Sequence, residues 1–210
     1  ALIARTEDLN ADLRTRIFAG LVLGRVGDPR FEHKTGKYGD HLLPPMIKIP
    51  EGTYPIGDDA SDYDVEKPQH TMYLEPFEIG KYPATNAEYA FFIAAGGYEN
   101  ELWWDTEASR VWRRGEADVD GPKRDWREQR GALRDYFDRI RPLVSTEETP
   151  KPQKDGWKDI AQISDEAFES LMDRWYPVGQ QKQPSFWNNL VYNNPNQPVV
   201  GICWYEARAY

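Results

Sequence analysis

The spacing of apolar residues changes several times along this chain of 210 residues. Residues 7–26 carry large apolar side chains four positions apart with charged residues between them, which predicts an amphipathic helix. The stripe consists of Leu9, Leu13, Ile17 and Leu21. Gly27 then ends the helix, and the polar, Gly- and Pro-containing residues 31–45 predict a linker. We therefore place a domain boundary near residue 43 and interpret the helix as a packing arm or the end of an upstream helical unit.

Alternation of apolar and polar residues begins after this boundary. Residues 46–57 alternate on both sides of Pro50-Glu51-Gly52, which predicts a hairpin, and residues 71–82 predict two short strands broken at Glu75-Pro76. Thr85 and Glu88 have the spacing of a capping box, and Gly96-Gly97 is a stop, so a helix is expected between them. Its buried face is predicted to contain Tyr89, Phe92 and Ile93.

Residues 113–180 are dense in charges of both signs and are interpreted as an insertion. Two short amphipathic helices are predicted at 130–143 and 164–177, with a flexible connector at 145–156. The chain then returns to aromatic, Asn- and Pro-rich sequence, an apolar run at Val199–Cys203 and the start of a helix at Trp204–Tyr210. No stop signal follows this helix, so we expect a further segment or a second chain to complete the domain.

Composition narrows the class of protein. Hydrophobic residues make up 40% of the chain and aromatic residues 13%, which is enough to form a core. The net charge of -9 argues against nucleic acid as a partner, and the lack of any run of 18 apolar residues argues against a membrane. The single cysteine, Cys203, excludes an internal disulfide and fits a reducing compartment, so a cytoplasmic location is predicted.

Four motifs in this order resemble the formylglycine-generating-enzyme (sulfatase-modifying factor) domain family. They lie at Ile47–Gly52, Glu66–His70, Phe77–Asn86 and Pro198–Tyr210. Each motif alone is weak, but the ordered set is specific. The resemblance covers residues 44–112 and 184–210 and leaves out the N-terminal helix and the insertion.

The resemblance implies an α+β fold of the irregular, loop-rich, C-type-lectin-like kind, with an N-terminal helix and a partly helical insertion. It divides the chain into residues 1–43, the helix and linker, and residues 44–210, the N-terminal half of a formylglycine-generating-enzyme-like domain with insertion 113–180. Active members oxidise a sulfatase cysteine to formylglycine with a cysteine pair and copper. The resemblance implies that this pair and the calcium-binding positions lie beyond the helix at Trp204–Tyr210. We therefore expect no catalytic residue and no cofactor in this chain, and calcium or copper only together with a C-terminal half.

Cysteine, histidine and aspartate can act as nucleophiles or metal ligands, but in this sequence a structural role is the favoured interpretation for each. Cys203 lies in an apolar run, which favours an inert buried thiol over a nucleophile or metal ligand. His33 and His41 are eight residues apart, unlike a helical metal pair, and His70 is expected to bind backbone at the head of a strand. The acidic segment at 58–64 lacks the residue order of an EF-hand, so a solvated loop is favoured over a calcium site. Its aspartates are Asp58, Asp59, Asp62 and Asp64.

A ligand groove is the remaining candidate site. The aromatic residues that suit one are Trp103, Trp104, Trp112, Trp187, Tyr192 and Trp204. Core packing is the favoured alternative for them, and the amides of residues 188–197 suit either a polar ligand or turns. The predicted ligand-binding residues are Trp103, Trp104, Trp112, Trp187, Asn188 and Tyr192.

Two functions remain open. The first, which the insertion and the core-like cysteine favour, is a non-catalytic module that binds a ligand or a protein, of the kind found as sensors or as variable proteins diversified by retroelements. The alternative is the scaffold half of a copper-dependent formylglycine-generating oxidase acting on sulfatase cysteines, or of a related iron-dependent oxidase. The partner is accordingly an unidentified protein or small molecule, together with the segment or chain that completes the domain.

Overall fold

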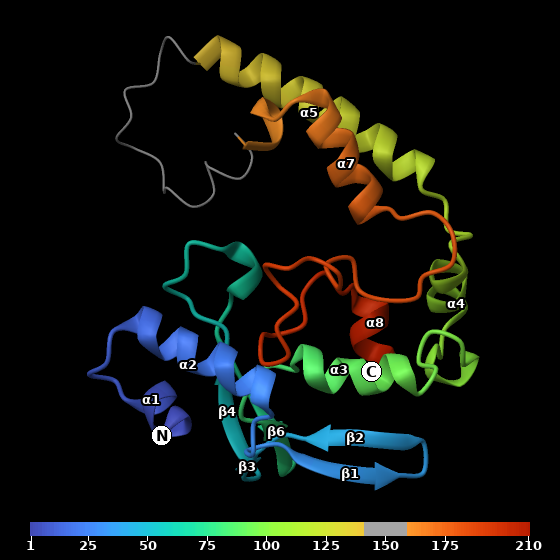
Figure 1. The fold of residues 1–210 in the computed structure, drawn as a ribbon. Helices are drawn as coiled ribbons and strands as arrows, with labels where there is room; N and C mark the ends of the chain where they lie inside the picture. The colour runs from blue at the N-terminus through green and yellow to red at the C-terminus, as the bar shows by residue number, and fades with distance from the viewer. Residues whose placement is uncertain (141–158) are drawn as a thin grey trace. The chain divides into compact units, whose positions relative to one another are not determined.

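The computed structural model describes residues 1–140 and 159–210. The chain divides into two compact units. Unit 1 contains residues 1–97 and 186–202 with Tyr210, and unit 2 contains residues 98–185 and 203–209. Unit 1 combines helices with strands, and the described part of unit 2 is helical (Figure 1). The α+β class is therefore correct.

Four strands of unit 1 form two consecutive antiparallel ribbons. β3 (Met46–Ile49) pairs with β6 (Phe77–Gly80), and β4 (Gly52–Ile56) pairs with β5 (His70–Leu74). Ile49 lies opposite Phe77 and Gly52 opposite Leu74, so Pro50-Glu51 and Glu75-Pro76 face each other where the pairing stops. Proline has no N–H for the ladder, and a proline at each side explains the interruption. The predicted hairpin at 50–52 is wrong, because β3 and β4 pair with other strands, whereas the break at Glu75-Pro76 is confirmed.

The predicted linker also contains regular structure. β1 (Glu32–Gly36) and β2 (Gly39–Leu43) form an antiparallel hairpin, with Gly39 at φ +122° directly after the turn. Nine of its ten residues are exposed and only Leu42 is partly covered, so the strands show no apolar alternation that could have predicted them.

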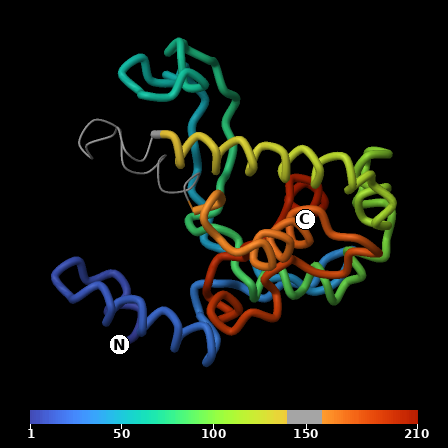
Figure 2. The backbone as a smooth tube through the Cα atoms, turned by 90° about the horizontal axis from the view of Figure 1, so that it is seen from above, coloured from blue at the N-terminus to red at the C-terminus, as the bar shows by residue number. Residues whose placement is uncertain are grey.

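The predicted N-terminal helix is two helices, α1 (Leu2–Glu7) and α2 (Leu13–Val26), which lie next to each other in Figure 2. Asp12 separates them, because its side chain accepts a hydrogen bond from the Thr15 N–H and starts α2. The predicted apolar stripe does not form a buried face of the helix, because three of its members, Leu9, Leu13 and Ile17, are exposed. Ala19 and Leu23 are buried instead. Gly27 ends α2 as predicted.

The helix α3 (Asn86–Ala94) starts with the predicted capping box, formed by Thr85 and Glu88. Tyr89 is fully buried, and Phe92 and Ile93 are half-buried beside it. The aromatic ring of Tyr89 stacks on Tyr210, with ring centroids 5.1 Å apart. This helix is the centre of the unit 1 core.

The segment that covers the start of α3 is the Asn-rich loop, defined here as residues 188–197. The carbonyls of Gln197 and Pro195 accept hydrogen bonds from the N–H groups of Asn86 and Ala87, the unpaired donors of the first helical turn. The side chain of Asn86 also donates to loop carbonyls, those of Tyr192 and Asn194, at 2.7 and 2.9 Å.

The same loop binds the second half of α2. The side-chain amide of Asn194 donates to the Leu21 carbonyl at 3.1 Å, and that of Asn196 donates to Asp28 at 2.8 Å. Gly24 of α2 faces this contact so closely that a Cβ there would lie 2.5 Å from Asn194 Oδ1. The loop therefore joins α2 to α3 inside unit 1.

Unit 2 begins with the short helix η2 (Glu101–Trp103) and α4 (Glu107–Arg114). Thr106 and Ser109 form a capping box at the start of α4, and Gly115 ends it at φ +67°. A Cβ on Gly115 would lie 2.1 Å from the Gly179 carbonyl oxygen, so only glycine permits this close approach. The unit continues with α5 (Asp120–Ile140), α7 (Asp165–Trp175) and α8 (Trp204–Ala209).

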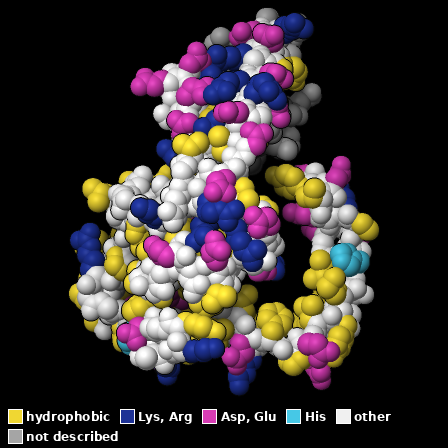
Figure 3. Space-filling model, turned by 90° about the vertical axis from the view of Figure 1, so that its right-hand side faces the viewer, with side chains coloured by type: hydrophobic (Ala, Val, Ile, Leu, Met, Phe, Trp, Pro, Cys, Tyr) yellow, Lys and Arg dark blue, Asp and Glu magenta, His cyan; other side chains and the backbone are white. Residues whose placement is uncertain are grey.

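Helices α5 and α7 pack side by side and are held by charged pairs (Figures 1 and 2). Arg127 donates two hydrogen bonds to Glu169, and Lys123 donates to Asp173. Trp126 of α5 packs against Trp175 of α7 with ring centroids 5.1 Å apart, and Phe168 and Met172 of α7 are buried. Figure 3 shows basic and acidic side chains interspersed over the upper part of the molecule, at the height of α5 and α7 in Figure 1.

The two helices predicted within residues 113–180 are present, but the first is longer than predicted. α7 starts at Ser164 as expected, whereas α5 begins ten residues before its predicted start. Asp118 begins α5, because its side chain accepts hydrogen bonds from the N–H groups of Asp120 and Gly121. The predicted connector at 145–156 lies outside the described residues. None of the described helices has the length and apolar character needed to cross a bilayer.

Gly24→Ala tests the contact between α2 and the Asn-rich loop. The added methyl group has no space, since the Asn196 backbone nitrogen would lie 2.7 Å away, and we expect a loss of about 1–3 kcal/mol of unfolding free energy. The matched control is Gly20→Ala in the same helix, where the nearest atom is 3.9 Å away and better helix propensity adds up to about 1 kcal/mol. Urea denaturation measures both, and equal stabilities of the two variants would contradict this packing.

Candidate functional site

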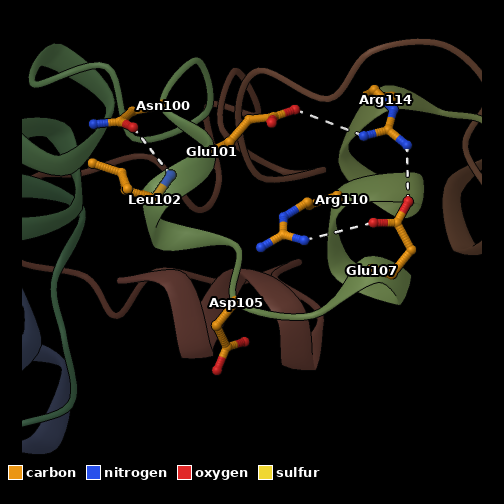
Figure 4. Close-up of a pocket in the computed structure, with 7 residues that line it drawn as sticks. All are labelled: Asn100, Glu101, Leu102, Asp105, Glu107, Arg110 and Arg114. Atoms are coloured by element: carbon orange, nitrogen blue, oxygen red, sulfur yellow. Dashed lines mark hydrogen bonds and ion pairs between the residues drawn. The ribbon is translucent and has the colours of Figure 1, made fainter.

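A hollow of about 620 Å³ in unit 2 is lined by charged side chains. We call it the charged hollow; its residues are Asn100, Glu101, Leu102, Asp105, Glu107, Arg110 and Arg114. Figure 4 shows that η2 and the residue before it supply one side and α4 the other, with the Arg110 guanidinium reaching into the space between them. The sequence analysis did not identify this site. Two signals could have predicted it: the capping box and the Gly115 stop indicate α4, and the spacing of the arginines of α4 places their side chains near one another.

Arg114 and Arg113 are fixed by several acceptors. Arg114 donates to Glu116 at 2.8 Å and to Glu107 at 3.3 Å. Arg113 is buried, and it donates to the carbonyls of residues 98 and 99 and to Glu101 at 2.7 Å. These hydrogen bonds hold α4 against the segment that leads into η2.

Arg110 is held much less firmly. Its guanidinium lies 3.6 Å from Glu107 in an ion pair too long for a hydrogen bond. Within the described residues it donates no hydrogen bond, in contrast to Arg113 and Arg114.

Asp105 turns away from the other lining side chains (Figure 4). It accepts hydrogen bonds from Arg208 of α8, with 2.9 Å from the guanidinium Nε to each carboxylate oxygen. The hydrogen bond from Arg208 lowers the pKa of Asp105 below its ordinary value, so this edge of the hollow is an ion pair at neutral pH.

The predicted ligand-binding residues are distributed over both units. Trp103, Trp104 and Trp112 belong to unit 2, where Trp104 is fully buried and stacks on Trp112 with ring centroids 5.9 Å apart. Trp104 also packs against Tyr98, at 5.7 Å. The structure thus places Trp104 and Trp112 in the aromatic core of unit 2, and their role in ligand binding stays a prediction.

The other three predicted residues lie in unit 1. Trp187 is half-buried, with its ring 6.1 Å from Tyr89, and Tyr192 packs edge-on against Phe186. Asn188 is exposed. The neighbouring amides of the Asn-rich loop make the hydrogen bonds to α2 and α3 described above, and Asn189 and Asn194 also form local turns by accepting from the N–H groups of Val191 and Asn196. A role of these amides in binding a polar ligand stays a prediction.

Cys203 lies half-buried directly before α8. Burial raises the pKa of its thiol to about 11, so the protonated form dominates at neutral pH. Its backbone N–H donates to the carboxylate of Glu206 at 2.7 Å. The predicted inert thiol is consistent with both observations.

Glu206 is buried, with 3% of its surface exposed, and no cation in the described ranges pairs with it. Besides the Cys203 N–H it accepts a short hydrogen bond from the Tyr98 hydroxyl. Burial raises the pKa of Glu206 despite these hydrogen bonds, which lower it. The side chain satisfies an orphan donor at the start of α8, as the Glu88 side chain does at the start of α3.

The histidines and the acidic loop form no common centre. His70 Nδ1 lies 3.1 Å from the Pro68 carbonyl at the first residue of β5, which confirms its predicted backbone contact. His33 and His41 lie on the paired strands β1 and β2. Asp58 accepts a hydrogen bond from the Ala60 N–H inside its own loop. Residues 1–140 and 159–210 contain no group of three or more His, Cys, Asp or Glu side chains arranged to hold a metal ion.

Comparison with known protein families shows to which family the chain belongs. The model of the sulfatase-modifying factor enzyme 1-like domain matches residues 34–210, so the chain belongs to this family and the resemblance inferred from the four motifs is confirmed. The match begins after α2 and includes α5 and α7, so the helical insertion lies inside the family domain.

Curated relatives are similar over parts of their length. Hercynine oxygenase of Mycolicibacterium smegmatis is 39% identical over 62 residues, which are 28% of this chain and 14% of the relative. Formylglycine-generating enzyme of Thermomonospora curvata is 25% identical over 168 residues, 79% of this chain and 42% of the enzyme. The formylglycine-generating enzyme of Mycobacterium tuberculosis is 33% identical over 57 residues, 27% of this chain and 19% of the enzyme. The chain thus spans less than half the length of each of these relatives.

Glu206→Gln tests the buried carboxyl of unit 2. Because the folded-state pKa of Glu206 is raised, its contribution to stability is fully present below its ordinary pKa and is lost as the pH rises through the folded-state value. Glutamine keeps an acceptor for the Cys203 N–H and does not ionise. We therefore expect the variant to gain stability relative to the wild type between pH 4 and pH 8, measured by urea denaturation in steps across this range.

The control for this experiment is Glu128→Gln, an exposed position of α5. It is expected to leave the pH dependence of the wild type unchanged. Parallel stability profiles of the wild type and Glu206→Gln would show that Glu206 does not titrate as a buried group.

Proposed function

We propose that this chain acts as a non-catalytic binding module of the sulfatase-modifying factor family. The observation that supports this most is the state of Cys203. A cysteine pair with copper is the chemistry implied by the family resemblance, and it requires thiolates. Here the single cysteine of the chain is held as a thiol by burial, with its backbone bound to Glu206.

The charged hollow supports a binding role from a second direction. It presents charged groups on a surface formed by two adjoining segments, and one of them, Arg110, is held only by an ion pair of 3.6 Å with Glu107 among the described residues. In this proposal the domain has the loop-rich, C-type-lectin-like fold, which holds its binding residues on loops and short helices packed by aromatic rings. The variable-protein and sensor roles and a cytoplasmic location belong to the same proposal.

A second candidate is the frame of an oxidative enzyme, and the curated relatives favour it. Their names describe a hercynine oxygenase and formylglycine-generating enzymes. On this alternative, unit 1 and unit 2 form a scaffold, and the reacting groups come from a further segment or a partner chain, with copper or another metal bound there.

An oxidation assay separates the two candidates. The complete polypeptide in which this sequence occurs is incubated with copper and a sulfatase peptide that contains the target cysteine, and in a parallel reaction with hercynine, iron and oxygen. Mass spectrometry measures oxidised product. We expect none in either reaction, while the Thermomonospora curvata formylglycine-generating enzyme converts the peptide as a positive control.

Cys203→Ser completes the test. Turnover by the wild type would overturn the non-catalytic proposal, and the variant would then locate the chemistry. Full activity of Cys203→Ser would support the scaffold alternative, and loss of activity in a folded variant would make Cys203 a reacting group.

A further inference from the structure

The charged hollow contains one cation that is available to a ligand. Arg113 and Arg114 each make two or more hydrogen bonds, and Arg208 is paired with Asp105. Among the described residues Arg110 has one ion-pair contact, with Glu107 at 3.6 Å, and its guanidinium reaches into the hollow (Figure 4). A guanidinium binds a carboxylate best through two parallel N–H···O hydrogen bonds, and this fork is unused in Arg110.

The charge balance around Arg110 limits what can bind there. Four guanidiniums and four carboxylates make up the hollow and its direct ion-pair partners. The basic residues are Arg110, Arg113, Arg114 and Arg208, and the acidic residues are Glu101, Asp105, Glu107 and Glu116. A phosphate or a dicarboxylate would bring excess negative charge next to these acids. A ligand that is itself neutral, with one positive and one negative group, keeps the balance.

We propose that the charged hollow binds a small zwitterion of the amino-acid type. The ligand carboxylate pairs with the guanidinium of Arg110, and the ligand ammonium pairs with the exposed carboxylates of Glu101 and Glu107. The proposal specifies the ligand class for the binding function proposed above and rests on it.

The apolar part of the hollow indicates the kind of side chain. Leu102 lines it and is 79% exposed, so an aliphatic ligand side chain would cover apolar surface that now faces water. The volume of about 620 Å³ is ample for a single amino acid. L-Leucine is therefore a suitable probe.

An NMR titration of the ¹⁵N-labelled chain tests the proposal with three matched probes. L-Leucine has both charges, 4-methylpentanoate lacks the ammonium group, and 3-methylbutylamine lacks the carboxylate. We expect L-leucine to shift the side-chain resonance of Arg110 and the amides of α4, with a dissociation constant of about 1 mM. The two single-charge probes are expected to bind at least tenfold more weakly.

Arg110→Gln provides the residue-level test. Its ion pair is long and partly exposed, so the variant should keep the dispersed spectrum of the folded chain. We expect it to bind L-leucine at least tenfold more weakly. The matched control, Arg124→Gln, removes an exposed arginine of α5 outside the hollow and should bind like the wild type.

Three results would overturn the proposal. These are no shift with L-leucine up to about 20 mM, equal binding of 4-methylpentanoate, and unchanged binding by Arg110→Gln. The probe comparison uses the wild type alone, so it decides the question even if the variant does not fold. The two experiments can fail separately. If L-leucine does not bind, the result of the oxidation assay still decides whether the protein is catalytic. If the oxidation assay shows turnover, binding of L-leucine would still identify a separate ligand site.

Discussion

The hydrogen bonds between the Asn-rich loop and the start of α3 are the constraint on which unit 1 depends. More than 100 residues separate the partners in sequence, yet Asn86 donates to loop carbonyls from both its side-chain amide and its backbone N–H. Buried backbone groups must be paired, and these hydrogen bonds pair donors at the start of α3 with four loop carbonyls, those of residues 192, 194, 195 and 197. The loop also binds α2 through Asn194 and Asn196, so one irregular segment fixes two helices.

Most polar side chains that could be taken for a binding or catalytic site in the sequence instead hold secondary-structure elements in place. The amides of the loop hold helices, Glu88 and Glu206 cap α3 and α8 as buried carboxylates, and Cys203 provides a backbone donor at one of these caps. Such groups are satisfied inside the fold and offer little to a ligand. Arg110 differs, because its charge faces an open hollow and its ion-pair contact in the described part of the chain, with Glu107, is 3.6 Å long. This contrast is the physical basis for the proposal that unit 2 binds a ligand.

Short sequence motifs correctly predicted helix ends that depend on hydrogen bonds between neighbouring residues. The capping box of Thr85 and Glu88, the Gly27 stop and the Ser164 start of α7 follow from hydrogen bonds within a few residues, and each was readable. Strand pairing was not, because Pro50-Glu51-Gly52 has the composition of a turn while its neighbours pair with residues 70–80. The exposed hairpin β1–β2 has no apolar alternation to detect. The charged hollow was missed because its residues come from two segments whose approach depends on Arg113.

Hydrogen exchange at the start of α3 tests the central claim that the Asn-rich loop serves structure. The amides of Asn86 and Ala87 are measured in the wild type, in a variant that loses the contact and in a control variant, and the exchange is followed by NMR. Asn86→Ala retains the residue-86 amide but removes two hydrogen bonds to loop carbonyls, so these amides should exchange at least tenfold faster, equivalent to about 1.4 kcal/mol. Asn188→Ala, which alters an exposed amide, should leave them unchanged. Equal exchange rates in all three proteins would contradict the account.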